Sequence, residues 1–451
     1  MKKFGFDFPE NPRNTILMET EEKWYLNLLK EKRGIEPKPI KRSNFGQYNM
    51  AVNYSTSVLE ESKAVNDIAI YNIDHMAQVE FTGKDACSLL NRVLPANIEN
   101  MKIGQCKYSV LLTEKGTVID DLIVMRRDEE DFVIVINAGH DITGKGEEHG
   151  ETKEFIADAD HIAKYKKDGE DVKIEDISDQ IVKIDIQGRF SFKLVKELYG
   201  ESVMKNRNKP AKNMGYFTFN EFDYENEHYI ISRTGYTSRW GFELYVPQKV
   251  AVEQFKRIVE KAVDLGGLLV GLGGRDENRT SAGNVGLPLN GSEYDQQHTF
   301  TNAPLFAAAV DMEKDFVGKS EIQKELDEGI KKQMCLIISE GIVVGRGVYS
   351  LDGKRLGTVT SSINSPNVSL EKRQFIGSKR KSVNAEDGTA AIGLAWFYES
   401  PYGEVKTNVP VHFFKEDAEK NPKGKPVLGF ICPDGIMPAT APKPLKKIAN
   451  L

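Results

Sequence analysis

The sequence has few of the features that mark secreted, metal-binding or membrane proteins. Only four cysteines occur among 451 residues and none forms a CxxC pair, so neither a zinc knuckle nor a redox disulfide site is indicated. Scattered cysteines fit reduced thiols in the cytoplasm. The first residues reach Asp7 and Glu10 before any apolar run, and later apolar runs end before the ~20 residues of a membrane-spanning helix. We therefore expect a cytoplasmic protein with no membrane segment.

Positive charge is not in excess either. The chain carries 61 Lys and Arg residues against 67 Asp and Glu residues, a net charge of -6. This balance offers no broad positive field for a nucleic-acid backbone, so we expect no nucleic-acid partner. No GxSxG, GxGxxG or GxxxxGK[ST] motif occurs, which leaves serine-hydrolase and nucleotide-binding chemistry without a signal.

Histidines offer little support for a metal site. His140, His149 and His161 lie in one polar, charge-rich stretch, but their spacings match no common metal template. We predict no metal, and we expect these three side chains to be solvated surface groups.

The organisation of the chain predicts several domains. A chain of this length with 40% hydrophobic residues can bury a sizeable core and suggests two or three domains. Residues 1–48, interrupted by prolines, predict an N-terminal extension with one amphipathic helix. Residues 49–330 mix strand and helix patterns and predict an α+β core. Residues 331–451 contain short apolar runs between Gly, Asp, Asn and Pro, which predict a small β-barrel or sandwich with a polar insert at 370–389.

Two adjacent carboxylates interrupt an apolar strand in the segment GTVIDDLIV. Because side chains alternate across a strand, Asp120 and Asp121 are predicted to face opposite ways and not to share one environment. A buried carboxylate needs a partner that offsets its desolvation, so at least one of them should face a pocket. The alternative is that one caps the preceding hairpin and the other lies at a sheet edge.

Two later segments also carry notable charges. SRTGYTSRWGFELYV places Glu243 between apolar strand residues, where a solvent-facing position is the alternative. LVGLGGRDENRTSAG has a glycine-rich turn followed by Arg275 and by Asp276, which we expect to cap the start of a helix.

Seven segments, taken together and in this order, resemble the aminomethyltransferase superfamily, which includes the glycine-cleavage T-protein and tetrahydrofolate-dependent demethylases. They are NIDHMAQVEFTGKDA, KYSVLLTEKGTVIDDLIVMR, IDIQGRFS, SRTGYTSRWGFELYVP, LVGLGGRDENRTSAGNVGLPLNGSEYDQ, DFVGKSEI and GTVTSSINSPNVS. A collinear run of motifs is far more specific than any one of them. The resemblance implies an α+β fold: a discontinuous two-domain folate-binding core, with tetrahydrofolate in a central channel, and a small C-terminal β-barrel domain.

The resemblance also implies roles for particular residues. Asp120 falls on the family's catalytic aspartate, Glu243 on the acid that grips the pterin, and Arg275 on the arginine that completes the folate pocket. Tyr108 and Asn137, from the strands that flank Asp120, are further candidates for lining the cofactor site. A carboxylate suits a pterin because it can accept two neighbouring N–H groups in one planar fork.

The chain departs from the glycine-cleavage enzymes in a segment that we expect to lie on the side of the one-carbon donor. Where those enzymes have GYTG, this chain has GYTS, which ends at Ser238 and is followed by Arg239 and Trp240. We expect Arg239 and Trp240 to remodel the donor side of the site. A small methylated donor needs a closed pocket, so the sequence slightly favours a demethylase that forms 5-methyltetrahydrofolate. The alternative is a glycine-cleavage T-protein acting on an aminomethyl-lipoyl carrier protein. A third possibility, a non-catalytic folate-binding module, is disfavoured because Asp120 is present.

Overall fold

The computed structural model describes most of the chain. The described residues are 12–54, 56–140, 143–148, 151–207, 209–237, 239–281, 293–294, 299–302, 306–329, 332–366, 368–369, 374–375, 390–397 and 409–432. The predicted insert at 370–389 lies outside these ranges apart from one short strand, β22 (Gln374–Phe375). Within them, no helix combines the length and the apolar character needed to cross a membrane.

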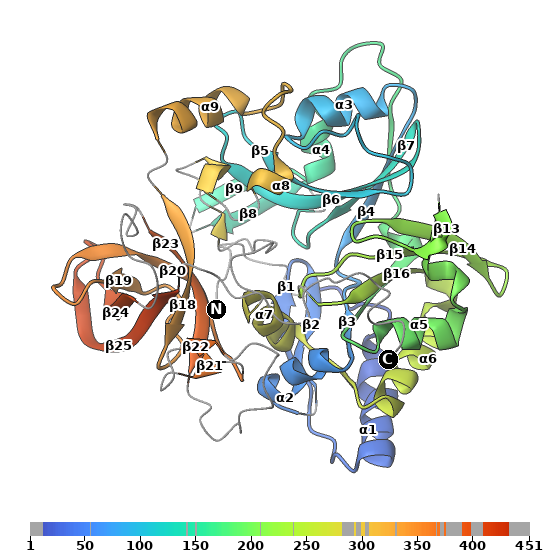
Figure 1. Ribbon diagram of the computed structural model, residues 1–451, viewed down its shortest axis with the longest axis horizontal. Coiled ribbons are helices and arrows are strands. Elements are labelled where there is room, and N and C mark those ends of the chain that lie inside the picture. The colour runs from blue at the N-terminus through green and yellow to red at the C-terminus, as the bar shows by residue number, and fades with distance from the viewer. Residues whose placement is uncertain are drawn as a thin grey trace.

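A six-stranded sheet forms one half of the core. Its order is β14-β15-β16-β11-β3-β17. The strands are β3 (Ala69–Asn72), β11 (Ile181–Gln187), β14 (Phe219–Tyr224), β15 (Glu227–Ser232), β16 (Gly241–Pro247) and β17 (Leu268–Leu269). Helices α5 (Ser191–Tyr199) and α6 (Gln248–Asp264) cover one face (Figure 1).

The two faces of this sheet differ in chemistry although both are buried. Val182, Ile184 and Ile186 of β11 belong to the apolar core beneath the helices. The alternate residues Lys183, Asp185 and Gln187 are fully buried on the opposite face. That polar face is therefore turned toward the interior of the molecule.

A five-stranded sheet is inserted in the chain between β3 and β11, which makes the core discontinuous. Its order is β10-β4-β7-β6-β5. The strands are β4 (Ala77–Thr82), β5 (Cys106–Leu112), β6 (Val118–Asp128), β7 (Asp131–Ile136) and β10 (Lys173–Asp176). Helices α3 (Ala86–Val93) and α4 (Asp158–Ala163) pack on it, and the hairpin β8 (Gly144–Glu148) and β9 (Glu151–Phe155) precedes α4.

The C-terminal part is a closed barrel with the order β18-β23-β20-β19-β24-β25. The strands are β18 (Gln333–Ser339), β19 (Gly347–Tyr349), β20 (Arg355–Asn364), β23 (Ala391–Phe397), β24 (Val409–Glu416) and β25 (Pro422–Cys432). Its interior holds a separate apolar cluster that includes Ile337, Val359 and Phe413. The short strand β21 (Val368–Ser369) pairs with β22 outside the barrel. Of the two architectures left open by the sequence, the barrel is the one formed.

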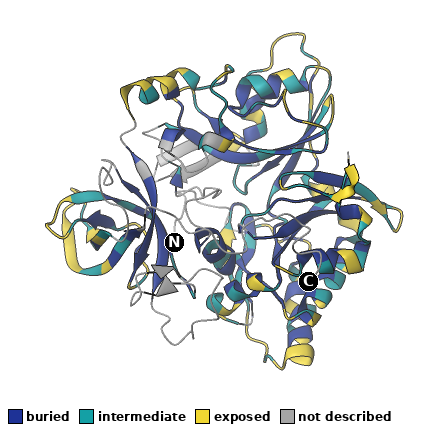
Figure 2. Cartoon of the chain, viewed as in Figure 1, coloured by how far each residue is buried: buried dark blue, intermediate teal, exposed yellow. Residues whose placement is uncertain are grey.

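The remaining elements join these parts. The N-terminal segment forms a π-helical turn (Thr20–Tyr25), α1 (Leu26–Arg33), β1 (Lys41–Phe45), β2 (Tyr48–Asn53) and α2 (Val58–Lys63). Elsewhere lie β12 (Lys205–Asn206), β13 (Lys209–Asn213), α8 (Phe306–Ala309) and α9 (Lys319–Glu328). Helix α7 (Leu272–Ser281) occupies the middle and contacts β2, α2 and the barrel strands β20 and β23 (Figure 1). Elements facing this centre are mostly buried, whereas α1 and α9 carry exposed residues (Figure 2). The domain boundaries at 48 and 330 stay predictions.

Candidate functional site

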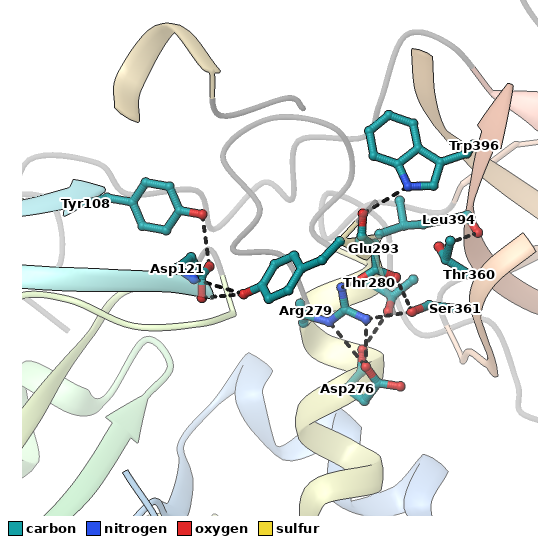
Figure 3. A network of polar contacts seen from close by, with 11 residues as sticks. Tyr108, Asp121, Asp276, Arg279, Thr280, Glu293, Thr360, Ser361, Leu394 and Trp396 are labelled. Atoms are coloured by element: carbon teal, nitrogen blue, oxygen red, sulfur yellow. Dashed lines mark hydrogen bonds and ion pairs between the residues drawn. The ribbon is translucent and has the colours of Figure 1, made fainter. Parts of the chain in front are cut away.

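The two adjacent aspartates of β6 form the centre of the site. Asp120 is 1% exposed and Asp121 is 5% exposed. The hydroxyl of Tyr294 lies 2.8 Å from Asp120 Oδ1 and 2.9 Å from Asp121 Oδ1, and Nδ2 of Asn137 donates to the same two oxygens at 3.1 and 2.6 Å. The Tyr108 hydroxyl donates to Asp121 Oδ2 at 2.9 Å (Figure 3). Tyr108 and Asn137, both predicted from the sequence, therefore lie in one cluster with Asp120.

The prediction that the two aspartates occupy different environments is wrong, because β6 is irregular at this point. Its register with β5 shifts between Leu111 and Leu112, leaving Ile119 as a bulge beside Asp120. Its pairing with β7 begins only at Ile123. Bulges and unpaired strand ends disturb the alternation of side chains. Both carboxylates therefore reach the same tyrosine and the same asparagine.

Burial dominates the acidity of this pair. It raises the pKa of Asp121 to about 7, and the negative charge of Asp120 acts in the same direction. Burial also raises the pKa of Asp120, while His140 lowers it. Within the described residues, Oδ2 of Asp120 has no hydrogen-bond partner. A buried carboxylate oxygen without a protein donor is the kind of atom that a ligand can satisfy.

His140 and Asp158 lie beside this free oxygen. Nδ1 of His140 is 4.0 Å from Asp120 Oδ2 and 3.4 Å from Asp158 Oδ1. One nitrogen or oxygen atom from each of the three residues lies within 4.8 Å of the others. The expectation that His140 is a solvated surface group is wrong, because its side chain is only 25% exposed and faces these carboxylates. Its spacing gave no signal, since the β8–β9 hairpin separates it from Asp158 along the chain.

Glu243 lies on the polar face of the six-stranded sheet. It is 4% exposed, which excludes the solvent-facing alternative. Its Oε2 accepts a hydrogen bond from the Thr234 hydroxyl at 2.6 Å and lies 3.2 Å from Nζ of the fully buried Lys183. Asp185 is its direct partner across β11 and β16. Burial and the charge of Glu243 raise the pKa of Asp185, whose Oδ2 has no hydrogen-bond partner in the described part of the chain.

Arg275 stacks on an aromatic ring near the start of α7. Its guanidinium carbon lies 4.0 Å from the centroid of Tyr236. Its Nε has no hydrogen-bond partner among the residues that the structure describes. Tyr236 interacts electrostatically with both Arg275 and Asp121, so it links the aspartate cluster to this side of the site. Helix α7 begins at Leu272, so the expectation that Asp276 caps a helix start is wrong.

Arg239 and Trp240 are both buried but lie in different surroundings. The Nη1 of Arg239 donates to the Thr237 carbonyl at 3.3 Å, and burial lowers the pKa of the guanidinium. The opposite charge of Glu277 acts on Arg239 from α7. Trp240 belongs to the apolar core of the six-stranded sheet. Their role on the donor side stays a prediction.

A buried ion pair connects the site to the barrel. Arg279 of α7 donates from Nη1 to Glu293 Oε2 at 3.1 Å and from Nη2 to Ser361 Oγ of β20 at 3.0 Å. Trp396 of β23 donates from Nε1 to the Glu293 carbonyl at 2.9 Å (Figure 3). The next residue, Tyr294, contacts both aspartates. The docking of the barrel therefore bears directly on the position of Tyr294.

Sequence reasoning missed several residues of this site: His140, Asp158, Lys183, Asp185, Glu293 and Tyr294. For two of them a signal existed. In IVKIDIQG, Lys183 and Asp185 alternate with apolar residues, which indicates a strand with one polar face. The others meet their partners only through tertiary contacts, which no local sequence pattern reveals.

Comparisons with known proteins agree with the sequence motifs. The family model described as the GCVT N-terminal domain matches residues 40–314. An aminomethyltransferase of Thermosipho melanesiensis is 32% identical over 332 residues, which cover 72% of this chain and 82% of the relative. One of Halalkalibacterium halodurans is 30% identical over 378 residues, covering 82% and 90%.

A solved structure supports the fold. The crystal structure of the glycine cleavage system aminomethyltransferase T from Bartonella henselae matches with a TM-score of 0.68 at 23% identity, covering 93% of this chain and 96% of that one. This likeness and the closed barrel confirm the predicted fold class. Because the family model spans more than half of the sequence, this chain belongs to the aminomethyltransferase superfamily, the tetrahydrofolate-dependent one-carbon transferases that its motifs resemble.

Proposed function

We propose that this enzyme is an aminomethyltransferase that passes a one-carbon unit from an aminomethyl-lipoyl carrier protein to tetrahydrofolate in the cytoplasm. The observation that carries the proposal is the buried carboxylate of Asp120, whose Oδ2 lacks a protein donor within the described residues. The matching relatives are named aminomethyltransferases, which supports this donor over the small methylated donor that the sequence slightly favoured.

The polar groups of the site fit a reduced folate. Its pterin carries neighbouring N–H groups, and the polar face of the six-stranded sheet presents the carboxylates of Glu243 and Asp185 opposite one another. Arg275 adds a cation held in place by Tyr236. When bound, tetrahydrofolate supplies the nitrogen that takes up the one-carbon unit.

Asp120 performs the central electrostatic step. In its ionised form the carboxylate would stabilise the positive charge that develops on the transferred carbon and on the folate nitrogen that takes it up, while the lipoyl sulfur leaves as a thiol and the amino group leaves as ammonia. Its pKa is raised by burial, so it can also exchange a proton near neutral pH. Tyr294 and Asn137 hold Oδ1, whereas Oδ2 has no hydrogen-bond donor among the described residues and faces His140. Such fixed positioning can lower the barrier by several kcal/mol.

Product analysis tests the proposal. The purified chain is incubated with tetrahydrofolate and either an aminomethyl-lipoyl carrier protein or methylated sulfonium, amine and aryl ether donors. The proposal expects 5,10-methylenetetrahydrofolate from the carrier protein, and loss of that product in Asp120→Asn. The matched control is Asp128→Asn, at the exposed end of the same strand.

Two results would contradict the proposed function. Formation of 5-methyltetrahydrofolate from a small methylated donor alone would identify a demethylase, with Arg239 as the first residue to examine on the donor side. Tight folate binding without turnover of any donor would identify a folate-binding module.

A further inference from the structure

Buried negative charge gathers on one side of the site. Asp158, the first residue of α4, is completely buried, and neither of its carboxylate oxygens has a hydrogen-bond partner among the described residues. The same holds for Oδ2 of Asp120, and Asp121 is buried next to it. Burying unpaired carboxylates is strongly unfavourable, so a positive charge is required close to them.

His140 is held at the place where that charge is needed. Its backbone N–H donates to the Asn137 carbonyl at 3.2 Å, and its own carbonyl accepts from the Asp158 N–H at 3.0 Å. Its Nδ1 is 3.4 Å from Asp158 and 4.0 Å from Asp120. Burial alone would lower the pKa of His140, but the opposing charges of Asp120 and Asp158 raise it to about 10.

The other titratable groups facing Asp120 are negative or neutral. They are Asp121 on β6, Tyr108 on β5, Asp158 on α4 and Tyr294 in the segment 293–294. Burial raises the pKa of both tyrosines well above the usual range, so their hydroxyls stay protonated. Of the described titratable groups that face Asp120, His140 is therefore the one that carries a positive charge.

We propose that His140, fixed by Asp158, is a positioning residue of the one-carbon transfer: its positive charge keeps Asp120 ionised and ready for the donor. This inference rests on the proposed function, because it assigns a purpose to the charge of Asp120. His140 acts through Asp120 and does not itself need to touch the substrate. Asp158 in turn keeps the proton on His140 and the imidazole in place.

The pH dependence of turnover separates this role from simple structural support. Single-turnover rates are measured for the wild type, His140→Asn and Asp158→Asn from about pH 5.5 to 9.5. This range spans about four units around the pKa values that buried carboxylates reach. In His140→Asn the acid limb of the pH profile, the pH range in which the rate rises as Asp120 loses its proton, moves up by about one pH unit or more. The rate below this limb then falls about tenfold, and it recovers at high pH. Asp158→Asn removes a negative neighbour of Asp120 and the anchor of His140 at once, and these two changes shift the pH profile in opposite directions, so this variant is judged by the protonation of His140 described next. The matched control His228→Asn, at an exposed histidine on β15, follows the wild type.

A second readout does not depend on turnover. The histidine nitrogen signals are followed by NMR, and the signal that disappears in His140→Asn is assigned to His140. In the wild type it stays protonated through pH 8, about 1.5 units above the ordinary histidine value. In Asp158→Asn it loses its proton at lower pH.

The outcomes are distinguishable. An inactive wild type with every donor overturns the proposed function, and with it this role. An active wild type whose pH profile is unchanged in His140→Asn, or whose rate falls equally at all pH values, overturns this inference alone. A stoichiometric divalent metal in the purified protein, whose removal by a chelator abolishes activity, would also overturn it, because the metal would then supply the charge assigned to His140.

Discussion

The buried pair of Lys183 and Glu243 permits a test that separates stability from folate binding. Nζ of Lys183 lies 3.2 Å from Glu243 Oε2, and the two side chains are 0% and 5% exposed. Replacing Glu243 by Leu leaves the lysine buried without this partner, which typically costs about 3 to 5 kcal/mol. The entropy of unfolding grows with chain length and reaches about 0.9 kcal/mol/K for 451 residues, so the melting temperature should fall by roughly 3 to 5 °C.

The double variant Lys183→Met, Glu243→Leu supplies the control. Replacing both charges by apolar groups of similar size is often nearly neutral, so most of the lost melting temperature should return. Binding of tetrahydrofolate should not return, because the carboxylate that we propose as the pterin's partner is still missing. Thermal melts followed by titration calorimetry measure both effects. Restored folate affinity in the double variant would remove Glu243 from the folate site, and failure to recover stability would show that the pair is not coupled.

Three further predictions concern the aspartate cluster and the loop beside it. Tyr294→Phe removes the hydroxyl shared by the two aspartates. Turnover at neutral pH should fall about tenfold, because this factor corresponds to the loss of one hydrogen bond to a charged group, and the acid limb of the pH profile should move to higher pH. Burial raises the pKa of Asp121 to about 7 in the folded protein, whereas in the unfolded chain its pKa is about 4. Its contribution to the free energy of unfolding is therefore fully present below about pH 4 and is lost as the pH rises through about 7. Asp121→Asn should therefore raise the melting temperature relative to wild type more at pH 8 than at pH 5, and a pH-independent difference would contradict this sign. Gly46 has a φ of 58°, and a Cβ there would lie 2.6 Å from the Cβ of Ala138, so Gly46→Ala should lower both stability and turnover. Gly34→Ala, at a φ of 64° with nothing within 4 Å of the added Cβ, should lower the free energy of unfolding by roughly 1 to 2 kcal/mol and leave turnover unchanged.

The parts of the fold that the sequence predicts are those fixed by local patterns. Alternation in AQVEFTG marks β4, the continuous apolar run in DFVIVINAG marks β7, and helical spacing in the segment after Pro247 marks α6. The family motifs place Asp120, Glu243 and Arg275, and all three are buried in the structure. Their assigned roles stay predictions.

The parts that the sequence does not predict depend on tertiary contacts. Tyr294 lies 174 residues after Asp120 in the chain, and no periodicity predicts that the two side chains meet. His140 is ordinary in its local sequence and acquires its environment only when α4 brings Asp158 against it. The shared environment of the two aspartates depends on a bulge at Ile119, which strand alternation alone cannot reveal.

The most direct test of the account is a single-turnover measurement on Asp120→Asn with tetrahydrofolate and an aminomethyl-lipoyl carrier protein. Asparagine fills the same space and retains a hydrogen-bonding oxygen, but it carries no charge. We predict that tetrahydrofolate affinity stays within about threefold of wild type while the rate falls by about a hundredfold, which corresponds to about 2.7 kcal/mol of lost transition-state stabilisation. An Asp120→Asn variant that forms 5,10-methylenetetrahydrofolate at the wild-type rate would contradict the central role of this carboxylate.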